Sequence, residues 1–172
     1  MEKYKRDFIE RVTNHIDLVN KYANKIGHTY LHHDTDKLQG ELFEPYALSM
    51  KETLTDEEQQ RYDKATIKHI INNPHHPEYF LNKKDMDNVV NNFTRENPPV
   101  MLDCTRMTDQ AITEMCCDWC AMAEEFGNTP FDWMYETTGY IKYDDYDPPV
   151  RWLFSNHQYD LIHKTLEELW ND

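Results

Sequence analysis

The chain has 172 residues, a length that suits one domain able to bury its own hydrophobic core. Its formal net charge of −14 disfavours general binding to DNA or RNA, because that affinity comes from Lys and Arg contacts with phosphates. Only 4 glycines are present, which argues against a turn-rich all-β fold and against a glycine-rich phosphate loop. A small anionic ligand remains compatible with this charge if a metal ion supplies a local positive field.

Apolar patterning and cysteine usage favour a cytoplasmic protein. No run of 18 apolar residues occurs, and the N-terminus lacks the apolar core of a signal peptide. We therefore expect no membrane association and a location in the cytoplasm, or in the host cytoplasm if a phage encodes the chain. The cysteines are Cys104, Cys116, Cys117 and Cys120. They lie in one short span rather than spreading as a disulfide framework, so we expect buried, reduced thiols.

The first helix is expected over residues 3–26. Its apolar face consists of Phe8, Val12, Val19, Tyr22 and Ile26, at spacings that fit a helix. His15 falls on the same face, where a core residue would be expected. Residues 28–39 are predicted to form a short second helix that carries His33 and Asp34.

Two more helical segments are expected in the next part of the chain. Residues 41–50 predict a short helix or a turn. Residues 55–58, Thr-Asp-Glu-Glu, have the form of a capping box that begins a longer helix. One face of that helix consists of Tyr62, Ala65 and His69. Pro74 requires the helix to end, and His75 and His76 follow at once.

Residues 82–107 are predicted to be a long connection with at most one turn of helix, because they are rich in Asn and contain two adjacent prolines. A strong helix is expected from Thr108, which is placed to act as its N-cap. The apolar seam of this helix consists of Ala111, Met115, Asp118, Met122 and Phe126. Asp118 therefore points where an apolar residue would be expected.

The C-terminal part adds two helices and no strand. Residues 130–142 predict a short helix, and residues 143–149 an acidic loop. Ser155 and Gln158 are spaced as a second capping box, which opens a last helix that runs to Trp170.

The predicted fold is all-α: one helical bundle over residues 1–172, with about six or seven helices. Residues 130–172 are expected to pack on the rest of the bundle, and no alternating strand pattern of useful length occurs.

Three polar residues on three separate helices occupy core positions: His15, His69 and Asp118. An unpaired buried carboxylate costs several kcal/mol, so Asp118 in particular needs a partner. A metal ion would satisfy all three together with His33 and Asp34, because imidazole and carboxylate suit divalent ions such as Fe, Mn, Ni, Zn or Co. The alternative is a set of independent buried pairs, with Asp118 meeting a Lys or Arg.

The order His15, then His33-Asp34, then Asp118 resembles the H…HD…D signature of the HD superfamily of metal-dependent phosphohydrolases. The resemblance covers about residues 5–125 and implies a helical bundle with the metal site in its middle. The first histidine is closer to His33 than is usual for the superfamily, so His28 and His32 are alternatives for its role. Helical phase favours His15.

Further motifs make the resemblance more specific. They are Leu31-x-His33-Asp34-x-x-Lys37, Glu41-x-x-Glu44-Pro45-Tyr46 and Asn73-Pro74-His75-His76-Pro77-Glu78-Tyr79. The first is similar to the superfamily's L-x-H-D-x-x-K. Together they resemble an uncharacterised bacterial and phage family within the superfamily, and the extra histidines resemble those of branches that bind a second metal.

The resemblance implies a division of roles among these residues. His15, His33 and Asp118 would hold one metal ion, His69 with His75 or His76 a second, and Asp34 would bridge the two. Lys37 would neutralise charge on a phosphoryl group, and a surface lysine that pairs with Asp34 or Glu41 is the alternative. Glu44, Glu78 and Tyr79 are candidates for orienting a ligand imidazole or binding substrate.

The expected function is metal-dependent hydrolysis of a small nucleotide or another small phosphate ester, as a phosphomonoesterase or phosphodiesterase. The expected cofactor is a pair of divalent transition metal ions. The runner-up is a di-iron HD-type oxygenase, and the third alternative is a non-catalytic metal- or nucleotide-binding module. The expected partner is a small anionic substrate rather than polymeric nucleic acid or a membrane. The oligomeric state stays open.

Overall fold

The computed structural model of the chain describes residues 1–138 and 150–171. Seven α-helices account for most of the described residues, which confirms the all-α prediction. They are α1 (Lys3–Lys25), α2 (Gly40–Ala47), α3 (Asp56–Ile70), α4 (Lys83–Asn92), α5 (Asp109–Phe126), α6 (Pro130–Thr138) and α7 (Asn156–Trp170). Within the described ranges, no helix is both long enough and apolar enough to cross a membrane.

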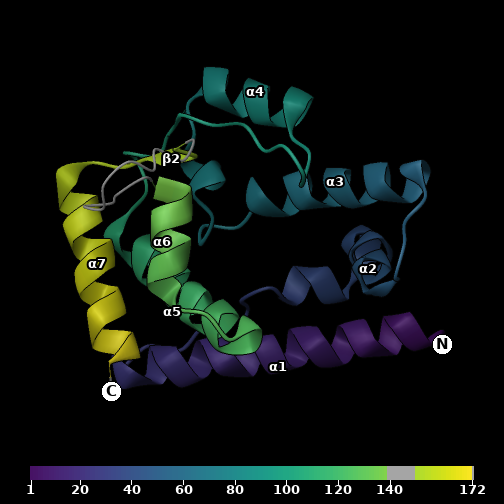
Figure 1. Ribbon diagram of the computed structural model, residues 1–172, viewed down its shortest axis with the longest axis horizontal. Helices are drawn as coiled ribbons and strands as arrows, with labels where there is room; N and C mark the ends of the chain where they lie inside the picture. The colour runs from purple at the N-terminus through teal and green to yellow at the C-terminus, as the bar shows by residue number, and fades with distance from the viewer. Residues whose placement is uncertain (139–149, 172) are drawn as a thin grey trace.

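Helix α1 runs along the whole molecule and joins its two halves (Figure 1). One half contains α2 and α3, and the other contains α5, α6 and α7. The C-terminal end of α7 lies against the end of α1, where Lys25 Nζ donates to the Leu169 carbonyl at 2.8 Å. The rings of Tyr22 and Trp170 stack there with centroids 6.0 Å apart.

The two halves have separate hydrophobic clusters. The larger cluster includes Val19 on α1, Ile112 on α5 and Leu166 on α7, all fully buried. The smaller cluster consists of Phe8, Val12, Leu42, Tyr46, Ala47 and Ala65. Burying a side chain of this size contributes about 1.5–3 kcal/mol, so each cluster stabilises its own half of the bundle.

Several helix ends follow the sequence signals. Thr55 and Glu58 form the predicted capping box at the start of α3, and Ser155 and Gln158 form the one at the start of α7. Thr108 accepts a hydrogen bond from the Ala111 amide and caps α5. In each case a side-chain oxygen satisfies a backbone donor that the first helical turn leaves free.

The prediction of a second helix over residues 28–39 is wrong. Residues 28–34 form no α-helix, and only Thr35–Leu38 forms a short 3₁₀ helix, η1. Asp34 has φ +57°, in the left-handed region, which a regular right-handed helix does not contain. The chain therefore turns sharply at the His-Asp pair.

The prediction of a long connection over residues 82–107 is also wrong in part. Helix α4 occupies ten of these residues, with Asn82 accepting a hydrogen bond from the Asp85 amide at 3.0 Å. Val89 is fully buried and Phe93 nearly so, and this helical spacing outweighs the low helix propensity of Asn. The segment that follows contains strand β1 (Leu102–Asp103).

Strand β1 pairs in parallel with β2 (Trp152–Leu153), a short pairing that the sequence did not predict. Two-residue strands are too short for an alternating pattern to reveal them. Helix α6 ends at Thr138 within the described residues. The predicted loop over residues 143–149, and the end of the helix predicted to reach 142, lie outside them.

All four cysteines are buried free thiols, as predicted. Burial raises the pKa of Cys117 to about 12 and that of Cys116 well above its ordinary value. At neutral pH the thiols are therefore protonated. Phe126, by contrast, is 54% exposed and does not continue the buried seam of α5.

Candidate metal centre

Helices α1 and α5 bring His15 and Asp118 together. His15 lies on the buried face of α1 between Val12 and Val19, and only 7% of it is exposed. Its Nε2 lies 3.0 Å from Asp118 Oδ1, and its Nδ1 lies 3.7 Å from Glu125 Oε2. The two polar residues that interrupt apolar seams thus face one another, and the partner of Asp118 is a histidine.

A fixed turn after α1 positions His33 and Asp34. Gly27, with φ +75°, follows the last turn of α1. Asn20 on α1 then holds the turn, because its Oδ1 accepts from the Tyr30 amide at 2.7 Å and its Nδ2 donates to the Tyr30 carbonyl at 3.2 Å. The left-handed conformation at Asp34 redirects the chain so that both side chains are buried. Asp is among the residues that tolerate this conformation.

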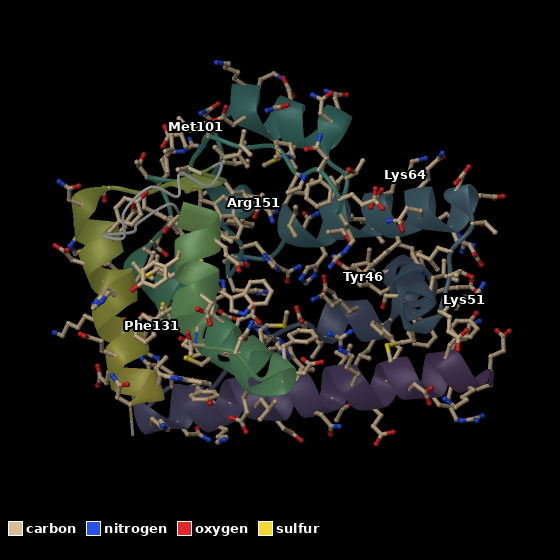
Figure 2. All side chains as sticks on the ribbon, viewed as in Figure 1. Tyr46, Lys51, Lys64, Met101, Phe131 and Arg151 are labelled. Atoms are coloured by element: carbon tan, nitrogen blue, oxygen red, sulfur yellow. The ribbon has the colours of Figure 1, made fainter. Side chains whose placement is uncertain are left out.

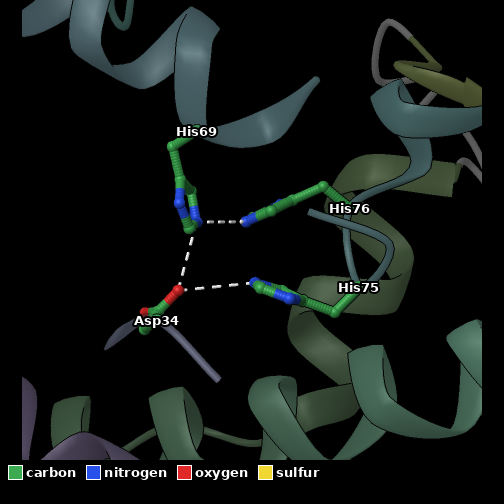
Figure 3. A group of neighbouring side chains, drawn as sticks. All are labelled: Asp34, His69, His75 and His76. Atoms are coloured by element: carbon green, nitrogen blue, oxygen red, sulfur yellow. Dashed lines mark hydrogen bonds and ion pairs between the residues drawn. The ribbon is translucent and has the colours of Figure 1, made fainter. Parts of the chain in front are cut away.

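The end of α3 and the turn beyond it supply three more imidazoles. Asn73 stabilises this turn, because its Nδ2 donates to the His69 carbonyl at 2.8 Å and its own carbonyl accepts from the His76 amide at 3.0 Å. His69 and His75 are almost fully buried. Their Nε2 atoms and that of His76 converge on one point beside Asp34 (Figure 3).

Asp34 lies between two groups of imidazoles, one at each carboxylate oxygen. Its Oδ1 lies 3.1 Å from His69 Nε2 and 3.4 Å from His75 Nε2. Its Oδ2 lies 3.8 Å from His15 Nε2 and 4.0 Å from His33 Nε2. A carboxylate in this position can bridge two ions.

Carboxylates that the sequence reasoning missed face the outer nitrogens of these rings. Glu114 Oε1 lies 3.0 Å from His33 Nδ1 and 3.6 Å from His75 Nδ1. Asp36 Oδ2 lies 2.9 Å from His69 Nδ1. A carboxylate that accepts Nδ1–H leaves the lone pair on Nε2, the arrangement usual for metal-binding histidines.

Charge inside the site divides the histidines into two kinds. Burial opposes protonation of His15, but Asp118 and Glu125 overcome it and raise the pKa of His15 to about 9. Burial likewise opposes protonation of His33, and Asp34 and Asp118 raise its pKa to about 10. Without a bound ion, these cations outweigh burial at Asp118 and keep its pKa well below the usual range. A metal ion at His15 and His33 would displace their protons.

His75 and His76 are neutral imidazoles in this arrangement. Burial lowers the pKa of His75, and the charge of His33 lowers it further. Burial, with His75 and His69 nearby, holds the pKa of His76 well below its usual value. Neutral imidazole is the form that binds a metal ion.

The buried polar atoms fit a metal better than they fit one another. Among the described residues, His33 Nε2, Asp34 Oδ1 and His75 Nε2 are buried without a well-aligned hydrogen bond, although Asp34 Oδ1 lies 3.1 Å and 3.4 Å from the Nε2 atoms of His69 and His75. Leaving such groups unsatisfied costs about 1–3 kcal/mol each, a cost that a bound metal ion would offset. The described residues contain three overlapping groups able to hold an ion: Asp34 with His69, His75 and His76; His15 with His33 and Asp34; and His33 with His75 and Asp118.

Lys37 extends from η1 toward the same carboxylate. Its Nζ lies 2.6 Å from Asp34 Oδ2 and 5.3 Å from the centre of the Tyr46 ring. Burial opposes its charge, but Asp34 more than compensates and raises the pKa of Lys37 above its usual value. Lys37 is therefore a cation inside the site rather than a surface partner of Glu41.

The site opens into a cavity of about 320 Å³. Its wall includes the metal-ligand candidates His15, Asp34, His69, His75, His76 and Asp118. Lys37, Arg95 and Arg151 add positive charge, and much of the remaining wall is aromatic. A volume of this size suits a small ligand.

The remaining predicted residues lie outside the cluster. Glu44 is exposed and pairs with Lys5 and Arg61, and Tyr79 is 44% exposed, so neither touches a ligand imidazole. Glu78 is fully buried but accepts hydrogen bonds from Arg151 and Trp152 rather than from a histidine.

His28 and His32, the alternatives for the first histidine, are both exposed. Neither belongs to a group of described residues that could hold an ion. His15, which helical phase favours, does belong to one.

Comparison with known proteins places the chain in a family without assigning an activity. No curated protein and no solved structure matches it. One family model matches residues 4–168, which is nearly the whole chain and includes every ligand candidate. The chain therefore belongs to the DUF5662 family, a family of unknown function.

Proposed function

We propose that the protein is a metal-dependent phosphohydrolase that acts on a small nucleotide or another small phosphate ester. The observation that carries this proposal is the position of Asp34, whose two oxygens face different imidazole groups while a lysine contacts the same carboxylate. The resemblance of the His15, His33-Asp34 and Asp118 pattern to the HD superfamily supports the same reaction class.

The donor set fits two divalent transition metal ions. His15, His33 and Asp118 would hold one ion, and His69 with His75 or His76 the other, with Asp34 shared. Two bound ions lower the pKa of a water molecule and polarise the phosphoryl oxygens. Fe, Mn, Ni, Zn and Co all accept imidazole and carboxylate ligands, so the donor set alone does not select one of them.

The residues of the chain then have separate tasks. The outer carboxylates Glu114 and Asp36 fix the rings of His33 and His69, so the ligand nitrogens stay directed at the ions. Lys37 offers a charged donor on the cavity side, where it stabilises negative charge that grows on the phosphoryl oxygens. Aromatic side chains of the cavity wall would lower the local dielectric constant and strengthen these interactions.

We propose the cytoplasm as the place of action, since four reduced thiols persist there. The second candidate function is a di-iron oxygenase, which the shared carboxylate between imidazole groups also suits.

The test has two measurements on the same protein. Elemental analysis gives the metal and its stoichiometry, and a panel of phosphate esters and nucleotides gives the best substrate. Lys37→Ala should then lower kcat by on the order of 100-fold while the metal content stays unchanged.

If Lys37→Ala retains both its metal and its activity, Lys37 only forms an ion pair with Asp34 and takes no part in the reaction. An iron pair that reacts with oxygen, with no phosphate ester turned over, would replace the hydrolase by the oxygenase. Absence of both reactions would favour a binding module.

A further inference from the structure

An exposed cation lines the cavity apart from the metal-ligand candidates. Arg95, on the chain beyond α4, lines the cavity with its guanidinium 4.6 Å from the centre of the Tyr62 ring. Its Nη1 lies 3.4 Å from the Thr66 hydroxyl, and its backbone amide donates to Asp63. Among the described residues the guanidinium forms no ion pair, so its charge is available to a ligand.

Arg95 is connected to the metal-ligand candidates by a series of aromatic rings. Tyr62 meets Tyr46 edge-on with ring centroids 5.5 Å apart, and Tyr46 meets His69 edge-on at 5.8 Å. Tyr46, Tyr62 and His69 all line the cavity. The cavity wall therefore has metal-ligand candidates at one position and a guanidinium over a tyrosine ring at another, with aromatic side chains between them.

Arg151 brings a second guanidinium to the same cavity. Its Nη2 donates to Glu78 Oε1 at 2.8 Å, and its guanidinium lies 4.6 Å from the Trp152 ring. The Trp152 indole donates to the same Glu78 oxygen at 3.0 Å. Because Glu78 is fully buried, it holds Arg151 in one orientation and reduces the entropy lost when an anion binds. Figure 2 labels Arg151 and Tyr46, which both line the cavity.

We propose that Arg95, assisted by Arg151, binds a second anionic group of the substrate. This inference rests on the proposed function and narrows it. The substrate class is a phosphate ester with two separate anionic groups: one at the metal-ligand cluster and one at the guanidinium groups. A planar ring carried by the same molecule packs on the aromatic wall. Guanidinium binds phosphate and carboxylate through paired hydrogen bonds, which suits this recognition.

The test compares two probes that differ only in the second anionic group: adenosine 5′-monophosphate and adenosine 3′,5′-bisphosphate. Calorimetry gives the Kd of each for the metal-containing protein, and kcat/KM is measured as well if either is turned over. The wild type should bind the bisphosphate more tightly. Arg95→Gln should reduce that preference by about tenfold to a hundredfold, because a hydrogen bond to a charged group is lost.

Two variants control for the loss of charge. Arg61→Gln makes the same chemical change on α3 at an exposed residue that pairs with Glu44, outside the cavity. Arg61→Gln should leave the preference for the bisphosphate over the monophosphate intact. Arg95→Lys should retain part of that preference. Arg151 is a poor site for this test, since its removal would leave Glu78 buried without its cation.

Equal affinity of the wild type for both probes, or an unchanged preference in Arg95→Gln, would overturn the inference. A preference that depends on Arg95 without any turnover would uphold the anion site and reject the phosphohydrolase. Circular dichroism of each variant confirms that it is folded.

Discussion

Glu114 is expected to support metal binding on both sides of Asp34. Its Oε1 faces the outer nitrogens of two imidazoles, at 3.0 Å from His33 Nδ1 and 3.6 Å from His75 Nδ1. The shorter distance is a hydrogen bond, whereas the longer one is an electrostatic contact. Removing the carboxylate should therefore weaken the two metal positions unequally.

The expected loss of metal affinity in Glu114→Ala follows from these distances. A hydrogen bond to a charged group contributes about 1.5–3 kcal/mol, and loss of such a partner typically costs about 10–100-fold in metal affinity. Glu114→Ala should reach this range at the position that contains His33. At the position that contains His75, the loss should stay below about tenfold, because no hydrogen bond is broken there.

The assay is a competition titration of each ion against a chelator of known affinity. Glu124→Gln is the matched control, because Glu124 is on the same helix but pairs with Lys21 and Tyr22 away from the cavity. Glu114→Gln keeps an acceptor oxygen without the charge, so its effect should be smaller than that of Glu114→Ala. Two metal affinities equal to those of the control, or a loss confined to the His75 position, would refute this reasoning.

Three further outcomes are expected. Chelation should lower the Tm of the wild type, because a metal ion that binds only the folded state stabilises it. Asp34→Ala should abolish the difference in Tm with and without chelator. Identical melting curves of the wild type in both conditions would count against the site. His69→Ala should lose about one metal ion and most activity while staying folded, whereas full retention of metal would leave a single-ion centre. Burial raises the pKa of the Cys116 and Cys117 thiols, so a thiol reagent at neutral pH should label them only after unfolding. Rapid labelling of these thiols in the folded protein would contradict their packing.

Helical phase was sufficient to locate much of the candidate site. His15 and Asp118 interrupt apolar seams of α1 and α5, and the structure brings them within 3.0 Å of each other. His69 shares the buried face of α3 with Ala65. These placements follow from side-chain direction on a helix, which the sequence spacing determines directly.

The turn at Asp34 could not be predicted in the same way. Asp34, in the left-handed conformation, lies four residues after Tyr30, whose backbone Asn20 holds. No helical or strand period encodes this contact between residues ten apart. The residues that orient the rings were missed for another reason. The chain has 32 acidic residues, and nothing in the local pattern separates Glu114 or Asp36 from those on the surface.

Helix α4 was missed although a signal existed. Met86, Val89 and Phe93 recur at spacings of three and four, and Asn82 is a good N-cap. The abundance of Asn favoured a loop interpretation, but burial of Val89 and Phe93 decided the structure.

The position of His15 on α1 has a consequence for how the bundle opens. Val12 belongs to the smaller hydrophobic cluster and Val19 to the larger one, so His15 lies on the boundary between them. Ions bound there would tie the turn after α1, the end of α3 and the middle of α5 to one another. Without ions, the α2–α3 half can unfold locally while the α5–α7 half stays intact, and its amides would exchange with solvent first. Metal loading would thus convert two cooperative units into one.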